Sequence, residues 1–196
     1  MNANTPPARI ADHPVDPQFL GRWSPRAFDG AAMTEAQMLT LLEAARWAPS
    51  SNNVQPWRLV WALRGDAGFE AIAATLVPFN HAWAHKAAAF VVIASKTTVL
   101  RDAEEKPNAP HAFDSGAAWA HLALQAHLGG LFTHAMGGFD AAALAPASAL
   151  PAHHMIHAVV AVGRQGDPAT LPEALRARET PNGRMTLTET TRRGSF

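Results

Sequence analysis

Residues 88–94 form an almost unbroken apolar run, Ala-Ala-Phe-Val-Val-Ile-Ala, that limits the possible folds of this chain. A short run bounded by polar residues and rich in β-branched and aromatic side chains predicts a β-strand. Because polar and apolar residues do not alternate in it, both faces of this strand must be covered. The run is far shorter than the roughly 20 apolar residues that span a bilayer. The chain is therefore expected to place a sheet between other layers.

The remaining elements are predicted from periodicity and from helix boundary signals. Thr34 and Gln37 match a capping box, and apolar residues at helical spacing continue to about Trp47. Further helices are predicted at 68–74, 114–128 and 171–178, with a short Ala-rich helix after residue 140. Further strands are predicted at 57–63, 155–162 and 184–190, and residues 101–110 are expected to form a loop. Strands and helices do not alternate strictly, so the predicted class is α+β, a sheet flanked by helices.

The helix predicted at 114–128 is apolar on nearly every side, since Ala, Leu and Trp residues surround its axis. A helix of this kind is normally buried at the centre of a domain or between subunits. The sequence leaves both possibilities open.

Length and composition favour one domain in a cytoplasmic protein. The 196 residues are enough for a single core, which we expect at 17–196, preceded by a polar arm at 1–16 without a signal-peptide pattern. The formal net charge is zero, so we expect no nucleic-acid partner and no membrane partner. The sequence contains no cysteine, which excludes disulfides, thiolate metal sites and cysteine nucleophiles.

Two polar patches are candidate ligand sites. Arg22, Ser24 and Arg26 alternate, so in an extended segment they point to one side and could bind a phosphate dianion. A solvated strand edge would give the same spacing. Residues 48–57 contain four adjacent hydroxyl and amide side chains closed by a proline. They form either a loop that holds a polar ligand or a plain turn between a helix and a strand.

Other patterns are weaker. Arg176 and Arg178 form a second pair of alternating arginines, and Gly137-Gly138 could allow close backbone approach or simply form a turn. No dinucleotide-binding glycine fingerprint and no nucleophile elbow occur. The histidines at 81/85 and 153/154/157 lack partnering carboxylates, and the H-E-x-x-H motif is absent, so we expect no metal site.

Together these patches resemble the FMN-dependent nitroreductase family across about 170 residues. The resemblance rests on segments that occur in the family's order: 22–28, 49–57, 79–80, 137–140, 176–178 and 185–189. It implies a homodimer with two FMN molecules at the interface. It also implies that residues 184–190 cross onto the partner's sheet as a strand, within a central mixed or antiparallel sheet.

The resemblance also implies which residues bind the cofactor. Those expected to surround FMN are Arg22, Trp23, Ser24, Arg26, Pro49, Ser50, Ser51, Asn53, Gln55, Asn80, Gly137, Gly138, Arg176 and Arg178. The two arginine segments would bind the phosphate, and residues 49–55 would come from the partner subunit. Asn80 would face the pyrimidine side of the ring, and the two glycines its reactive edge.

The implied reaction is ping-pong: NAD(P)H donates hydride, and a nitroaromatic, quinone or enone-like acceptor then takes its place. The flavin carries the chemistry, so no catalytic side chain is expected. Two departures concern charge near the ring: Trp83 stands where many members have Lys, and Gly137 where many have Glu. The rival hypotheses are a flavin sensor or store with little turnover, and a histidine-based metalloprotein.

Overall fold

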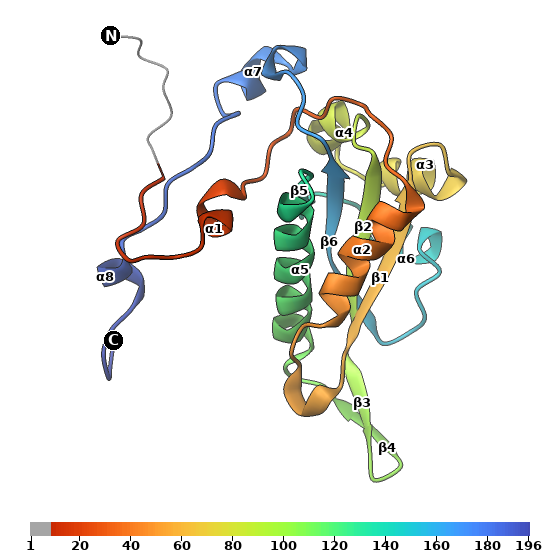
Figure 1. Ribbon diagram of the computed structural model, residues 1–196. Helices are drawn as coiled ribbons and strands as arrows, with labels where there is room; N and C mark the ends of the chain where they lie inside the picture. Colours follow the sequence, from red (N-terminus) through yellow and green to blue (C-terminus); the bar gives the residue numbers. More distant parts are fainter. Residues whose placement is uncertain (1–8) are drawn as a thin grey trace.

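A four-stranded antiparallel sheet forms the centre of the computed structural model, which describes residues 9–196 (Figure 1). In spatial order its strands are β1 (Trp57–Leu63), β2 (Ala89–Lys96), β6 (His154–Gly163) and β5 (Phe132–Met136). The register places Val91 opposite Trp61 on one side and opposite Val160 on the other. The α+β class with a helix-flanked antiparallel sheet, expected from the sequence, is confirmed.

Strand β2 is buried on both faces, as its apolar run predicts. Residues 89–95 are all buried, and alternate side chains enter two separate cores. Phe90 and Val92 pack on one face of the sheet, whereas Val91 and Ile93 pack on the other. The strand therefore needs a helical layer on each side.

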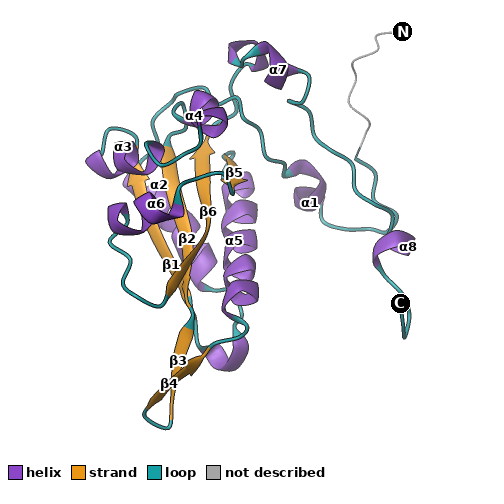
Figure 2. Ribbon diagram, turned by 180° about the vertical axis from the view of Figure 1, so that it is seen from behind, coloured by secondary structure: helices purple, strands orange, loops and turns teal. Residues whose placement is uncertain are grey.

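Those layers are formed by helices from both halves of the chain (Figure 2). Helices α2 (Glu35–Arg46) and α5 (His111–Leu128) cover one face. Helices α3 (Ala67–Ala73), α4 (Pro78–Ala84) and α6 (Ala141–Ala147) cover the other. None of the described helices is long and apolar enough to cross a membrane.

Helix α2 begins where the capping box predicts. The Thr34 side chain accepts a hydrogen bond from the Gln37 backbone N–H, and the Gln37 side chain accepts one from the Thr34 backbone N–H. These two bonds satisfy N–H groups that the first helical turn leaves free.

Helix α5 is buried on only one side in this chain. Ala118, Leu122 and Ala126 are completely buried against the sheet. The opposite side is open, and Phe113 and Leu128 are 82% and 64% exposed. Of the two possibilities that the sequence left open, burial at the centre of one subunit is therefore not what the structure shows.

The two chain ends lie side by side, away from the sheet (Figures 1 and 2). They contain three short helices: α1 (Pro17–Gly21), α7 (Glu173–Arg176) and α8 (Leu187–Thr190). Of the predicted N-terminal arm, residues 1–8 lie outside the described part, and residues 9–16 form neither helix nor strand.

The strand predicted at 184–190 is wrong for the chain as described. Residues 184–186 are irregular, and α8 follows. A second capping box begins this helix, because Thr186 and Glu189 exchange hydrogen bonds between side chain and backbone. The Thr-x-x-Glu spacing is a helix-start signal that the apolar alternation masked.

Two other predictions need correction, and some elements were missed. The loop predicted at 101–110 is largely a hairpin of β3 (Thr98–Arg101) and β4 (Glu104–Pro107), with left-handed residues at its turn, Asp102 and Ala103. The helix predicted at 171–178 shrinks to α7, because Pro172 keeps the preceding residue extended. A 3-10 turn, η2 (Pro168–Thr170), precedes it. Strand β5 and helices α1 and α4 were not predicted at all.

The buried face of α5 should dominate its contribution to stability. Leu122→Ala removes a completely buried side chain, so we expect the free energy of unfolding to fall by about 2–5 kcal/mol. Leu100→Ala is the matched control, since Leu100 is 65% exposed on β3. Its effect should stay within about 0.5 kcal/mol in the same denaturant titration. Equal losses for the two variants would contradict this packing.

Candidate functional site

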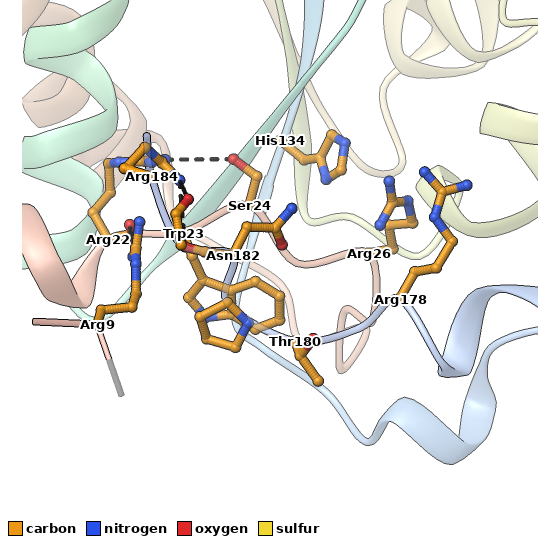
Figure 3. Close-up of a pocket in the computed structure, with 12 residues that line it drawn as sticks. Arg9, Arg22, Trp23, Ser24, Arg26, His134, Arg178, Thr180, Asn182 and Arg184 are labelled. Carbon is orange, nitrogen blue, oxygen red and sulfur yellow. Dashed lines mark hydrogen bonds between the residues drawn. The ribbon is translucent and has the colours of Figure 1, made fainter. Parts of the chain in front are cut away.

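A pocket of about 540 Å³ lies between the sheet and the two chain ends (Figure 3). Five of its lining residues are arginines: Arg9, Arg22, Arg26, Arg178 and Arg184. The others are Trp23, Ser24, His134, Thr180, Pro181, Asn182 and Gly183. The pocket therefore joins the predicted segment 22–26 to one of the two late arginines.

The extended segment after α1 brings the first motif into the pocket. Arg22 is the C-cap of α1, and its Nη1 lies 3.4 Å from the Ser24 hydroxyl oxygen. Arg9 braces this helix end, because its Nη1 donates to the carbonyls of Leu20 and Arg22, at 2.6 and 2.7 Å. Arg22, Ser24 and Arg26 all line the same cavity, as their alternation predicts.

A buried carboxylate connects this segment to the C-terminal part of the chain. Glu179 accepts hydrogen bonds from the backbone N–H groups of Arg26 and Ala27, at 2.6 and 2.8 Å. Its Oε2 lies 4.0 Å from Nη1 of Arg26, and its side chain is inaccessible to solvent. Charge-assisted bonds of this kind fix the relative position of two segments 153 residues apart.

The pocket is strongly cationic. Among residues 9–196, Arg26 is the one pocket arginine with a carboxylate within 4.0 Å. Burial, followed by the neighbouring charges of Arg184 and Arg9, lowers the pKa of Arg22. Burial also lowers the pKa of Arg26, while Glu179 opposes this shift. Guanidinium groups remain protonated at neutral pH despite such shifts, so the pocket is suited to an anion.

His134 adds a neutral hydrogen-bond acceptor to the pocket wall. Burial is the main cause that lowers its pKa, to about 4, and the charge of Arg26 acts in the same direction. Its Nδ1 lies 3.0 Å from the Pro25 carbonyl, which can only accept, so Nδ1 carries the proton. The remaining ring nitrogen, Nε2, then carries no proton and can only accept a hydrogen bond.

A second cavity of about 440 Å³ adjoins the arginine pocket and shares Arg22, Ser24 and His134 with it. Its other walls are mainly apolar: Phe19, Trp119, Ala120, Ala123, Leu124 and Ala135. A polar, cationic compartment next to an apolar one is suited to a ligand with an anionic tail and a flat hydrophobic body.

The polar loop predicted as a ligand site lies elsewhere in this chain. The backbone N–H of Ser51 donates to Asp114, in the first turn of α5, at 3.2 Å. The arginine pocket lies near the other end of α5, where β5 and its His134 follow. The structure therefore keeps five predicted residues together outside the arginine pocket of this chain: Pro49, Ser50, Ser51, Asn53 and Gln55.

The loop at 50–55 nonetheless has a defined backbone conformation. Its 3-10 turn, η1 (Ser51–Asn53), contains residues with left-handed backbone, and Asn52, Asn53 and Gln55 have φ of 50°, 56° and 53°. The Ser50 hydroxyl accepts from the Gln55 backbone N–H at 3.0 Å. The side chains of these residues are left largely exposed to solvent.

Asn80 and Gly138 are brought into direct contact. The Asn80 side-chain amide donates to the Gly138 carbonyl at 3.0 Å. A Cβ atom on Gly138 would lie 2.7 Å from that amide nitrogen, so a larger residue there would displace the Asn80 side chain. Gly137 has open space around it. Trp83, in the same helix as Asn80, is buried, and its ring centroid lies 4.7 Å from that of His134.

Two further side chains are placed outside the pocket. Arg176 donates from Nε to the Leu171 carbonyl at 2.9 Å and does not line the cavity. Lys86, the nearest lysine to the Trp83 position, does not line it either. Within residues 9–196, no three His, Asp or Glu side chains are gathered so as to hold a metal ion.

Sequence reasoning missed Arg9, His134, Glu179 and Arg184. Arg9 and His134 stand alone in the sequence, with no motif around them. Glu179 directly follows Arg178, so an acidic residue beside a proposed anion site was the available signal. Arg184 ends the turn Pro181-Asn182-Gly183, but the strand expected there directed attention away from its side chain.

The model of the nitroreductase family matches residues 20–164 of this chain. A crystal structure described as an oxidoreductase containing FMN is 41% identical, covers 96% of both chains and superposes with a TM-score of 0.94. A putative nitroreductase in complex with FMN from Desulfovibrio desulfuricans is 26% identical, covering 95% of this chain and 99% of its own, with a TM-score of 0.73.

One sequence relative comes from Mycolicibacterium smegmatis, an uncharacterized 15.4 kDa protein from the 5′ region of ask. It is 36% identical over 124 residues, which are 62% of this chain and 80% of that protein.

The buried neutral state of His134 should make stability depend on pH. The pKa of His134 in the folded chain, about 4, lies below its unfolded value near 6.5, so the unfolded chain binds the proton between these values. Its contribution is complete above pH 6.5 and is lost as the pH falls towards 4, by up to about 1.4 kcal/mol per pH unit. His134→Gln should remove this component when urea unfolding is compared at pH 7, 5.5 and 4.5. Parallel pH profiles for the two proteins would refute the assignment.

Proposed function

The chain belongs to the nitroreductase family, and we propose on that premise that it is an FMN-dependent oxidoreductase. It takes hydride from NAD(P)H and passes it to an oxidised acceptor such as a nitroaromatic, a quinone or an enone-like compound. The observation that carries this proposal is the five-arginine pocket beside an apolar cavity, in a chain 41% identical to an FMN-containing oxidoreductase.

The residues present fit the cofactor. FMN has a dianionic phosphate at one end and a flat ring system at the other, and the two adjoining cavities offer cations at one end and apolar walls at the other. The volume of about 540 Å³ lies within the usual range for small-molecule sites. We assign the phosphate to the arginine pocket, with Arg22, Trp23, Ser24, Arg26 and Arg178 among its walls.

Arg176, the other arginine of the late pair, has a different role in this proposal. Arg176 makes its bond to the Leu171 carbonyl outside the pocket. We therefore propose that it supports the turn carrying Arg178 and Glu179 instead of binding the phosphate itself.

We assign the ring to the side of the pocket at His134, which also lines the apolar cavity, and we propose that Asn80 and Gly138, which line neither cavity, support this side. The contact between Asn80 and Gly138 holds the chain after β5 in a fixed position, and the open space at Gly137 leaves room for a planar group. Trp83 supports His134 from behind and contributes no charge. The environment of the ring is therefore less ionic than in relatives with Lys and Glu at these positions.

When bound, FMN would supply the hydride-accepting and hydride-donating ring, and the side chains of this protein supply its placement. Arg22 and Arg178 counter the phosphate charge, and the apolar walls around Trp119 and Leu124 exclude water from the flat part of the site. His134, neutral at pH 7, can accept a hydrogen bond without adding charge. Donor and acceptor would bind at this site in turn, which would give ping-pong kinetics.

We further propose that the working unit is a homodimer in which Ser50, Ser51, Asn53 and Gln55 reach the partner's flavin. Two observations support this: the loop is shaped and exposed far from its own pocket, and the outer side of α5 exposes large apolar side chains. Exposed apolar surface of this kind marks an interaction site.

We also propose that 17–196 is a single domain in a cytoplasmic protein. Both cores draw on residues from widely separated parts of this range, so the sheet has no separable half. A chain without cysteine depends on no oxidising compartment for its stability.

The purified protein should be yellow and should release FMN, but not FAD, when it is denatured. Steady oxidation of NADH or NADPH should follow the addition of a quinone or nitroarene, with parallel lines in double-reciprocal plots at several acceptor concentrations. A yellow protein that shows no turnover with any of these acceptors would favour the rival flavin sensor or store. A colourless protein that cannot be reconstituted with FMN would refute the proposal.

A shared site can be tested by mixing two defective chains. Arg22→Ala damages the pocket, and the double variant Asn53→Gly, Gln55→Gly removes two loop amides while glycine keeps their left-handed backbone. Each homodimer should bind FMN weakly. Co-expression should restore about one quarter of the sites to normal affinity, because half the dimers are mixed and each mixed dimer holds one intact site. If the loop serves its own chain, no normal site can form.

A further inference from the structure

We propose that Asn182 is a site of spontaneous modification, at which the fold promotes conversion of the side-chain amide into a carboxylate inside the cationic pocket. The sequence contains one Asn-Gly pair, Asn182-Gly183, and both of its residues line this pocket. The conversion needs only water, so it does not depend on the proposed function. Its effect on ligand binding does rest on that function.

The reaction begins at the backbone nitrogen of Gly183. This nitrogen loses its proton to hydroxide and attacks the side-chain carbonyl carbon of Asn182, which closes a five-membered succinimide ring. The bond to the side-chain nitrogen breaks, and that nitrogen takes a proton from water and leaves as ammonia. A second water opens the ring at either carbonyl, so position 182 becomes an aspartate or a β-linked aspartate. Glycine hinders the attack least, because it has no Cβ.

The two reacting groups are not held apart by other contacts. Asn182 and Gly183 are exposed, and residues 181–186 form neither helix nor strand. Among residues 9–196, neither the Asn182 side chain nor the Gly183 backbone N–H has a hydrogen-bond partner. Apart from its chain neighbours, no described atom lies within 4 Å of the place that a Cβ on Gly183 would take. The succinimide ring therefore has room to close.

Arg184 activates the peptide bond between the two residues. Its Nη1 donates to the Asn182 carbonyl at 3.3 Å and to the Gly183 carbonyl at 2.8 Å. The Asn182 carbonyl belongs to the same peptide group as the attacking nitrogen. A guanidinium bound to this carbonyl therefore stabilises the negative charge that remains when the N–H loses its proton. The other arginines of the pocket add positive potential in the same direction.

Asn53 provides a comparison within the same chain. It is exposed, as Asn182 is, but Val54 follows it, and a β-branched side chain hinders approach to its own backbone nitrogen. The Val54 N–H also donates to the Ser51 carbonyl at 3.1 Å, so the nitrogen that would attack is already engaged. Conversion is therefore expected at Asn182 and not at Asn53.

Conversion would change the pocket in two ways. Figure 3 shows the Asn182 side chain in the middle of the pocket, between the arginines of its two ends. An aspartate at this position places a carboxylate among the guanidinium groups, where it competes with an anionic ligand. The β-linked product also lengthens the main chain by one carbon atom, which moves Arg184 relative to Arg22. The modified protein should therefore bind anions less tightly.

The first measurement is peptide mass spectrometry of the full-length protein after increasing times at pH 8. The peptide with position 182 should gain the mass difference between an amide and a carboxylic acid, and the peptide with Asn53 should not. Gly183→Ala should slow conversion about tenfold or more, because a Cβ hinders the attack. Arg184→Ala should slow it about threefold or more in the folded protein but not in urea. Arg193→Ala is the control, since it removes the same charge from an exposed position in the same segment.

An amide that persists at position 182, or a folded Arg184→Ala protein that converts at the wild-type rate, would overturn the inference. The second measurement compares FMN and riboflavin affinities by fluorescence titration of the apoprotein. Asn182→Asp should weaken FMN about tenfold relative to riboflavin, and Asn182→Gln, which keeps an amide, should not. Unchanged FMN affinity in Asn182→Asp would refute the effect on binding. A wild-type protein that binds neither flavin would refute the proposed function and leave the mass-spectrometric result standing.

Discussion

The buried carboxylate of Glu179 is the interaction on which the arrangement of the site depends. It accepts two backbone hydrogen bonds from residues 26 and 27, and so ties the turn after α7 to the segment after α1. A carboxylate hidden from solvent is costly unless it is bonded and paired. Here one segment supplies two hydrogen bonds to Oε1 and the charge of Arg26 at 4.0 Å from Oε2, while Oε2 has no hydrogen-bond partner among the described residues. Arg178 lies beside this carboxylate in the sequence, so fixing Glu179 also brings Arg178 to the pocket. The same bonds direct the chain that continues towards Arg184.

The sheet and its main helices could be predicted because their signals are local. The apolar run at 88–94 predicts a strand covered on both faces, as β2 is. The Thr34–Gln37 capping box begins α2 where the spacing predicts. Strand β5 was missed because it is short and lies at the edge of the sheet. Phe132, Thr133 and His134 mix apolar and polar side chains, so no apolar run marks it. The strand prediction at 184–190 was wrong for the opposite reason. The alternating Thr residues suggest a strand, whereas Thr186 and Glu189 cap a helix.

The candidate site could be predicted only as far as its motifs are contiguous. Arg22, Ser24 and Arg26 lie within five residues, so their shared direction follows from an extended backbone. Arg9 and Arg184 meet Arg22 only through the packing of the two chain ends, which no spacing in the sequence encodes. The role of His134 could not be predicted for the same reason. Its lowered pKa follows from burial against Trp83 and from the charge of Arg26, and both depend on tertiary structure.

The conformation of the loop at 50–55 supports the idea that one subunit's pocket is not the whole site. Left-handed backbone costs a non-glycine residue roughly 1 kcal/mol or more, and three of these residues adopt it. Within the chain that cost is offset by the bonds from Ser50 and Asp114, yet the exposed amides serve no contact in their own pocket. We propose that a backbone held in this shape serves a ligand bound outside its own chain. In the proposed homodimer, the exposed apolar side of α5, at whose first turn the loop is anchored, is the surface that would bring the second subunit and its proposed flavin site within reach.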